Sequence, residues 1–182
     1  MGKDFQSYVD AWRQTFREPR ELAWRGNWLV NGYCRDCRYC CGPQDSATPF
    51  PMALLPSQIR PDLDRDFYLL DAQTACLDQR GCKALGEQGC SLIREQRPLA
   101  CGLFPLVLAN GALWLYQICP ASLFVPLAGW MPLAHKAAAW LATLPESDLR
   151  HISIELDKTT LTDRYVNLHI TLFGGNVTQE NS

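Results

Sequence analysis

Four cysteines stand within eight residues of this chain, in the pattern C-x2-C-x2-C-C formed by Cys34, Cys37, Cys40 and Cys41. Two intervening residues let a tight turn bring consecutive sulfur atoms onto one metal ion. The same turn can aim backbone N–H groups at the thiolates and so stabilise their charge. Five further cysteines follow downstream, namely Cys76, Cys82, Cys90, Cys101 and Cys119. The pattern predicts a protein that ligates metal through cysteine.

The composition fits a single domain with no nucleic-acid or membrane partner. With 182 residues, 47% of them hydrophobic, the chain is long enough to bury a core. A formal net charge of -2 argues against a nucleic acid held by bulk electrostatics. Residues 121–144 are the most apolar stretch, but Pro126 and Pro132 interrupt it. We therefore expect a buried helix or loop there rather than a membrane span.

The cysteine usage favours a reducing, cytoplasmic environment. Residues 1–12 carry Lys3, Asp4 and Asp10 and contain no apolar signal-peptide core. Nine cysteines is an odd number, and a domain of this length does not depend on disulfides for stability. Reduced thiols held by metal are expected, with disulfides as the less favoured alternative.

The first hundred residues predict few regular elements. Apolar residues recur at helical spacing over residues 3–17, and Pro19 ends that helix. The proline-rich residues 49–56 predict an extended loop, and a short helix is expected within residues 56–75. Residues 76–101 show poor periodicity, so metal ligation is expected to hold an irregular backbone there.

Residues 106–118 predict a β-hairpin. The dipeptide Asn110-Gly111 suits the centre of a type I′ turn, because both residues accept positive φ. The predicted strands are residues 106–109 and 112–118, and the second delivers Cys119 at its end.

The C-terminal part predicts one helix and two strands. The helix is expected over residues 131–144, which are rich in Ala and Leu and precede Pro145. Alternating apolar residues predict strands over 152–156 and 166–172, joined around residues 159–163.

We therefore expect one α+β domain, rich in cysteine and loops, with helices and a hairpin around one or two metal sites. Its parts are an N-terminal helical segment over residues 1–30 and a metal-binding core over residues 31–120. A C-terminal helix and strands over residues 121–182 pack on that core.

The first cluster follows the ligand spacing of bacterial ferredoxins. In those proteins three cysteines at this spacing are joined by a remote cysteine that precedes a proline, as Cys119 precedes Pro120 here. The spacing favours a four-iron, four-sulfide (4Fe-4S) cluster on Cys34, Cys37, Cys40 (or Cys41) and Cys119.

Cys40 and Cys41 cannot easily serve one ion, because adjacent side chains diverge in either a helix or an extended backbone. We expect each to face a different metal, or one of them to lie outside the ligand shell. Two sites that meet at this pair would explain why so many cysteines follow.

Zinc is the alternative metal, because four-cysteine zinc sites need only tetrahedral sulfur. Zinc sites usually show a second C-x2-C pair, which this chain lacks. Cys76 follows an apolar stretch and is expected to be a small buried hydrophobe. None of His135, His151 and His169 is expected to bind metal.

The segment CKALGEQGCSLIREQRPLACGLFP, residues 82–105, resembles a known signature. That signature is C-x-x-L…C-x-I-Y-x-x-R-P-x-x-C-R-x-F-P of the zinc- or iron-chelating cysteine-cluster domains, often called YkgJ-like. The family's upstream C-x2-C-x2-C-C cluster and late Cys-Pro pair are matched as well, so the resemblance covers about residues 30–120. It implies eight metal ligands, which are Cys34, Cys37, Cys40, Cys41, Cys82, Cys90, Cys101 and Cys119.

The chain departs from that signature in three ways. Gly102 replaces the usual Arg, Leu92-Ile93 replaces the Ile-Tyr pair, and the spacing from Cys82 to Cys90 is long. Some members of the family are parts of flagellin lysine methylases, which implies a methyltransferase-associated activity as one alternative.

Arg97 and Pro98 match the Arg-Pro pair of the family. Pro98 fixes the approach of the chain to Cys101, and Arg97 can bind the cofactor by donating to a thiolate or a cluster sulfide. The alternative is a surface arginine before a turn.

The chain contains no phosphate-cradling glycine loop, no H-E-x-x-H and no G-x-S-x-G. An enzymatic activity would therefore depend on the metal or on a bound cosubstrate. The favoured function is an iron–sulfur protein with a redox or accessory role. The alternatives are a zinc-structured interaction module with a protein partner, a methyltransferase-associated enzyme, and a protein for metal storage or delivery.

Overall fold

The computed structural model describes residues 19–44, 49–87 and 89–174, together with Gln6, Val9, Asp10 and Arg13. The side chains of Arg35 and Asp36 are excepted. The helix predicted over residues 3–17 lies mostly outside the described residues, although the four described ones are helical.

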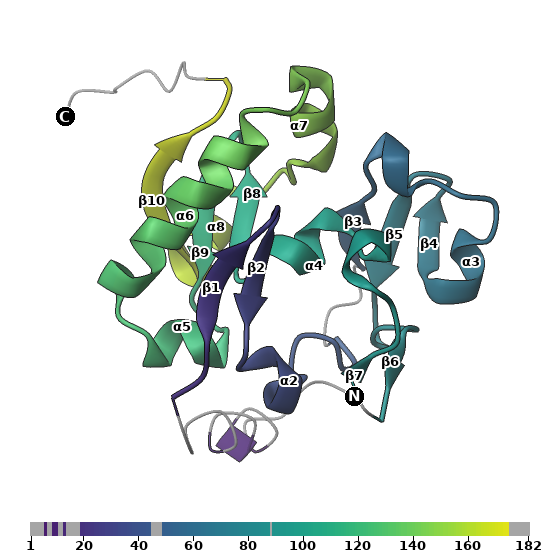
Figure 1. Cartoon of the computed structure of the whole chain (residues 1–182), viewed down its shortest axis with the longest axis horizontal. Coiled ribbons are helices and arrows are strands. Elements are labelled where there is room, and N and C mark those ends of the chain that lie inside the picture. Colours follow the sequence, from purple (N-terminus) through teal and green to yellow (C-terminus); the bar gives the residue numbers. More distant parts are fainter. Residues whose placement is uncertain are drawn as a thin grey trace.

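The fold is α+β, and two groups of elements lie side by side with a short helix between them (Figure 1). We name the first group the α6 lobe. It comprises β1 (Leu22–Arg25), β2 (Trp28–Asn31), β8 (Leu106–Ala109), β9 (Ala112–Tyr116), α5 (Pro120–Phe124), α6 (Leu127–Leu141), α7 (Glu146–Ile152), α8 (Lys158–Arg164) and β10 (Tyr165–Thr171).

The second group is the β5 lobe. It comprises β3 (Phe50–Ala53), the 3-10 turn η1 (Pro56–Gln58), α3 (Leu63–Asp66), β4 (Tyr68–Asp71), β5 (Thr74–Leu77), β6 (Leu85–Gly86), β7 (Gly89–Cys90) and the 3-10 turn η2 (Arg94–Gln96). Helix α4 (Leu99–Leu103) joins the lobes, because it packs against β2 and β8 on one side and β3 on the other.

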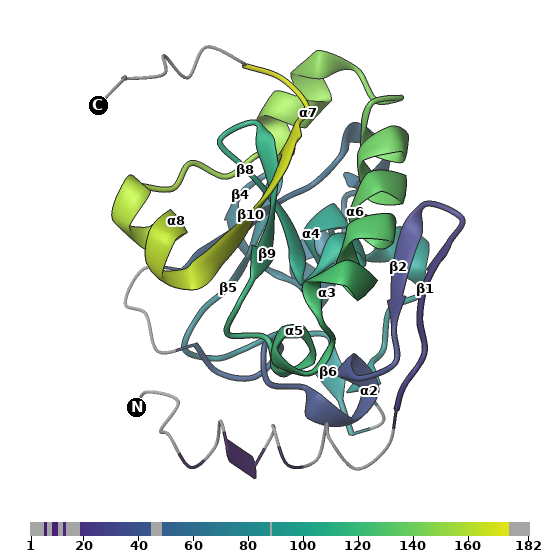
Figure 2. The same cartoon turned by 90° about the vertical axis from the view of Figure 1, so that its left-hand side faces the viewer.

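Helix α6 carries the main core of the α6 lobe. Its buried residues recur at helical spacing and form one face, which consists of Trp130, Leu133, Ala134, Ala137, Ala138 and Leu141. That face packs against the β1–β2 hairpin and β10, as Figure 2 shows from the side. Apolar burial of this extent is the main stabilising contribution in the lobe.

The helix predicted over residues 131–144 is displaced toward the N-terminus. Both prolines were expected to interrupt this stretch. Pro126 does so, because it precedes the first turn of α6, but Pro132 lies inside the helix. Pro132 is exposed, so water can reach the backbone carbonyl that its missing N–H leaves unpaired. The helix ends at Leu141, before the expected Leu144.

The predicted hairpin is confirmed. Asn110 and Gly111 both adopt positive φ, 50° and 75°, and the pairing runs from Leu106↔Leu115 to Ala109↔Ala112. Strand β10 pairs antiparallel with the other edge of β9, which confirms the last predicted strand to within a residue.

The strand predicted over residues 152–156 is wrong. Ile152 ends α7, and Ile154 makes only an isolated bridge to Ala109. The predicted connection is instead helix α8, because the Asp157 carboxylate caps its first turn by accepting the Thr160 N–H at 2.9 Å.

The N-terminal part holds more strand than predicted. Residues 22–31, all but the last inside the expected helical segment, form the β1–β2 hairpin, and Gly26 turns it at a φ of 58°. The loop predicted over residues 49–56 is also wrong, because β3 pairs with β5 there. Pro51 is tolerated because β3 is an edge strand of the sheet β3-β5-β4. The short helix expected within residues 56–75 is α3.

Within the described ranges, no helix combines the length and apolar character needed to cross a membrane.

Candidate metal centre

The eight predicted ligands come from four segments at one end of the molecule. Helix α2 (Cys34–Cys37), the β6–β7 hairpin and α5 all lie at the lower end in both views, and α4 lies above them (Figures 1 and 2). The first segment holds Cys34 to Cys41, the β6–β7 region holds Cys82 and Cys90, α4 holds Cys101, and Cys119 precedes α5.

The first cluster begins with a single helical turn, α2, and the chain turns away after it at Arg38. The N–H of Cys37 donates to the carbonyl of Tyr33 at 3.1 Å, so Cys34 and Cys37 occupy one turn of α2. Arg38 ends the turn with a φ of 49°, and its carbonyl accepts the N–H of Cys41 at 3.2 Å. Side chains three residues apart on a helical turn share a face, so the sulfurs of the first C-x2-C pair point the same way.

The Cys82 segment is held directly against this turn. The N–H of Cys82 donates to the carbonyl of Cys41 at 2.8 Å. A Cβ atom on Gly81 would stand 2.9 Å from the carbonyl carbon of Gly42, and Gly81 has a φ of 81°. Only glycine suits both the backbone conformation and this close approach.

Backbone N–H groups are aimed at two of the sulfurs. Burial is the largest influence on the pKa of Cys82 and raises it, whereas bonds from the N–H groups of Ala84 and Leu85 lower it. Burial likewise raises the pKa of Cys119, and bonds from the N–H groups of Ser122 and Ala121 lower it. In both cases the donors lie two and three residues after the cysteine, an arrangement that stabilises a thiolate.

Neighbouring thiols act on one another through their charges. Burial is the largest cause of the raised pKa of Cys34, and four thiols add to it in the order Cys119, Cys41, Cys37 and Cys101. The sulfurs of three sequence segments therefore lie within electrostatic reach of this one thiol.

Cys101 extends the group to the β5 lobe. Its pKa is also raised chiefly by burial, and then by the charges of Cys41, Cys82 and Cys90. Its Sγ lies 3.9 Å from the Sδ of Met52 in β3. Met52 is a neighbour that the cysteine pattern could not reveal.

Cys34 and Cys101 are exposed by surface area, although burial dominates the pKa of both. Surface area measures whether water touches the side chain, whereas desolvation depends on how much protein surrounds the sulfur. Protein therefore surrounds each sulfur, while the residue as a whole keeps contact with solvent.

Among the described residues, no three His, Cys, Asp or Glu side chains are drawn together as a formed metal site. The donor set nevertheless suits a soft metal, since it consists of thiols, with backbone N–H donors beside Cys82 and Cys119. Cys76 stands apart: it is buried in β5, and the charges that act on it come from Asp78 and Arg80.

Arg97 lies near Cys82 and Cys101. Its charge lowers the pKa of both Cys82 and Cys101. Its Nε and Nη2 atoms donate to the carbonyl of Leu92 at 2.9 and 2.8 Å, and its own carbonyl accepts a bond from Gln58. These bonds fix the loop before α4 and hold the guanidinium near the thiols.

Gly102 occupies the position where the resembled signature has Arg. A Cβ atom there would stand 2.6 Å from the ring of Trp28 in β2. The indole ring fills the space beside α4, so a glycine is required for α4 to pack on the α6 lobe.

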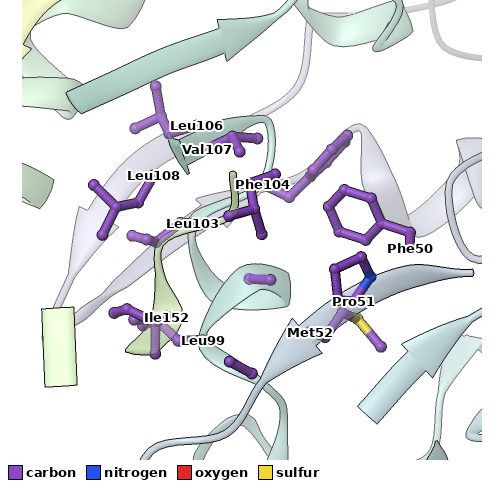
Figure 3. A pocket seen from close by; sticks show the side chains of 13 residues that line it. Phe50, Pro51, Met52, Leu99, Leu103, Phe104, Leu106, Val107, Leu108 and Ile152 are labelled. Atoms are coloured by element: carbon purple, nitrogen blue, oxygen red, sulfur yellow. The ribbon is translucent and has the colours of Figure 1, made fainter. Parts of the chain in front are cut away.

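Behind α4 lies an apolar cavity of about 40 Å³ (Figure 3). Its walls come from β3, α4, β8 and the end of α7, and include Met52, Leu99, Leu103, Phe104 and Ile152. No thiol lines it, but Met52 in its wall also contacts the Sγ of Cys101.

No family model, curated protein or solved structure matches the chain.

Proposed function

We propose that this protein binds metal through its cysteines and holds one or more iron–sulfur clusters, with a redox or accessory role. The observation that carries the proposal is the convergence of four separate cysteine-bearing segments, where the Cys82 N–H donates to the Cys41 carbonyl and the charges of the thiols reach one another. Seven cysteines enter these interactions, namely Cys34, Cys37, Cys41, Cys82, Cys90, Cys101 and Cys119.

Such a gathering is unfavourable without a cation. Deprotonating several neighbouring thiols places like charges together in a poorly hydrated space, which is why their pKa values rise. A bound metal offsets these charges, and the thiols then release their protons to become ligands. A fold that brings them together is most simply explained by ligation.

Iron–sulfur chemistry is favoured over zinc by the ligand spacing and by the surroundings of the thiols. The first cluster and Cys119-Pro120 follow ferredoxin usage. Backbone donors to the sulfurs of Cys82 and Cys119, and the positive charge of Arg97, are features that stabilise a cluster of net negative charge. When bound, the cluster would supply one-electron transfer.

The chain's own groups have separate tasks in this proposal. The N–H groups after Cys82 and Cys119 hold the ligands in orientation, Arg97 balances charge, and packing around Cys119 excludes water.

A zinc-structured interaction module is the second candidate. It is favoured by the short elements between Gly81 and Phe104, where β6 and β7 are two residues each. A segment with so few ladder hydrogen bonds gains much from metal links, whichever metal provides them. Membership of the YkgJ-like family, and with it an association with a methyltransferase, is a further proposal that rests on the sequence signature alone.

The test is to purify the full chain without oxygen and to record its visible absorption and its iron, sulfide and zinc content. We expect a brown protein that contains iron and acid-labile sulfide. A colourless protein with stoichiometric zinc would replace the first candidate with the second, and a protein without metal would refute both.

A further inference from the structure

The clustered thiols divide between the two lobes. On one side, the ring of Tyr33 meets the ring of Phe124 edge-on, with centroids 5.6 Å apart. This contact joins the residue before Cys34 to helix α5, which begins after Cys119. Cys119 is itself part of the buried core of the α6 lobe, so α2 and α5 present their cysteines together on that lobe.

On the other side, a second set of thiols packs on the core of the β5 lobe. Cys82 and Cys90 are both partly buried against that core. The β6–β7 pairing sets Cys90 opposite Leu85, and the Sγ of Cys101 contacts Met52, a residue of the same core.

The adjacent pair Cys40 and Cys41 stands at the boundary between the lobes. Cys40 follows α2, which the contact between Tyr33 and Phe124 ties to the α6 lobe. The carbonyl of Cys41, in contrast, accepts the Cys82 N–H in the β5 lobe. Adjacent side chains diverge, so the pair can serve both sides.

We infer that the chain holds two metal centres, one on Cys34, Cys37, Cys40 and Cys119 and the other on Cys41, Cys82, Cys90 and Cys101. Each centre receives four thiolates, the number that a four-cysteine zinc site or an iron–sulfur cluster requires. The inference rests on the proposed function and adds the number of centres and the division of ligands.

The test compares alanine variants of the full chain after oxygen-free reconstitution, either with iron and sulfide or with Zn²⁺ alone. We expect Cys119→Ala and Cys90→Ala each to bind half the metal of the unchanged protein. The double variant Cys37→Ala/Cys119→Ala should still bind half, because both residues serve one centre. The double variant Cys90→Ala/Cys119→Ala should bind none, and the control Cys76→Ala should bind the full amount.

The boundary pair gives a second test that leaves the packed lobes unchanged. Cys40→Ala should remove the centre that Cys119→Ala removes, and Cys41→Ala the one that Cys90→Ala removes, so combining Cys40→Ala with Cys90→Ala should abolish binding. Loss of all metal in any single variant, or loss of the same centre from both boundary variants, would overturn the division. A single centre in the unchanged chain would also overturn it while leaving the proposed function intact. An unchanged chain that binds no metal would refute the proposed function itself.

Discussion

At the residue scale, Gly102 shows how the site constrains its surroundings. It lies beside Cys101 in α4, and the ring of Trp28 occupies the space where a side chain would begin. An arginine at this position would have to displace the indole ring. The departure from the resembled signature therefore accompanies the packing of α4 on Trp28, and the cysteine next to it is kept.

Replacing Gly102 with alanine tests this packing. Alanine favours a helix more than glycine does, so an unconstrained site would gain stability. We expect Gly102→Ala instead to lower the free energy of unfolding by about 1–3 kcal/mol, because the new methyl group overlaps the Trp28 ring. Urea unfolding measures the change. Gly86→Ala is the control, since its nearest neighbour would lie at 3.5 Å. Greater stability of Gly102→Ala would contradict the account.

The thiols should make the metal-free, reduced protein sensitive to alkaline pH. Burial raises the pKa of Cys34, Cys101 and Cys119 above the ordinary 9.0. Above pH 9.0 the unfolded chain loses these protons first, so the unfolded state is stabilised and the folded state is not. The thermal unfolding midpoint should therefore be level up to about pH 9 and fall beyond it. Metal-loaded protein, whose thiolates are already neutralised, should fall less. A midpoint of the metal-free protein that stays level to about pH 10 would contradict the raised pKa values.

At the element scale, the β8–β9 turn organises the C-terminal half. The Nδ2 atom of Asn110 donates to the carbonyl of Leu156 at 2.8 Å, and its Oδ1 atom accepts the N–H of the same residue at 2.9 Å. This side chain thereby binds the backbone that leads into α8. Asn110 therefore shapes the β8–β9 turn, and its side chain holds residues 154–156, which were predicted to form a strand, without a full strand pairing.

Asn110→Asp separates these two roles. Aspartate tolerates the positive φ of the turn, but its carboxylate cannot donate to the Leu156 carbonyl. We expect a loss of about 1 kcal/mol in the free energy of unfolding, with faster hydrogen exchange at the start of α8. Asn167→Asp is the matched control, because within the described part of the chain the Asn167 side chain accepts a bond, from the His169 N–H at 2.8 Å, and donates none. Equal effects of the two substitutions would mean that the bond to Leu156 contributes nothing.

Local signals in the sequence predicted the elements that depend on local chemistry. The Asn110-Gly111 turn and the apolar face of α6 need no distant partner to be recognised. The strand β3 was missed because Pro51 suggests a loop until its place at a sheet edge is known. The Ile154–Leu156 alternation misled because these residues pack on Tyr165 and Leu161 without a full strand pairing.

The same distinction between local signals and contacts of distant segments applies to the candidate site. The cysteine spacing predicted that Cys34 and Cys37 share one turn of backbone, which is confirmed, whereas their role as ligands stays a prediction. It could not predict that Cys82 binds the backbone of Cys41, or that Met52 contacts Cys101, because both contacts join segments about 40 to 50 residues apart.

At the scale of the whole molecule, the cysteine cluster lies where the two lobes meet. Each lobe has its own buried core, and α4 contributes Leu99 and Leu103 to one core while Ala100 packs on the other. In the proposed function, metal ligation adds to the links between the lobes that α4 and the contact of α7 with β3 already make.

Metal removal should therefore affect the lobes unequally. We expect a chelator to raise hydrogen exchange across residues 81–105 and in β3 to β5, because short elements there rely on ligation. Helix α6, with six buried residues, should keep its protection. Hydrogen–deuterium exchange with peptide resolution makes the comparison, and equal loss in α6 would mean that the metal supports one indivisible core.

X-ray absorption at the iron and zinc edges of protein purified without oxygen tests the central claim most directly. The account predicts a stoichiometric metal whose first shell contains sulfur alone, at about 2.3 Å. A second shell of iron would identify clusters. A first shell of nitrogen or oxygen, or no bound metal at either edge, would contradict the claim that these cysteines gather to hold metal.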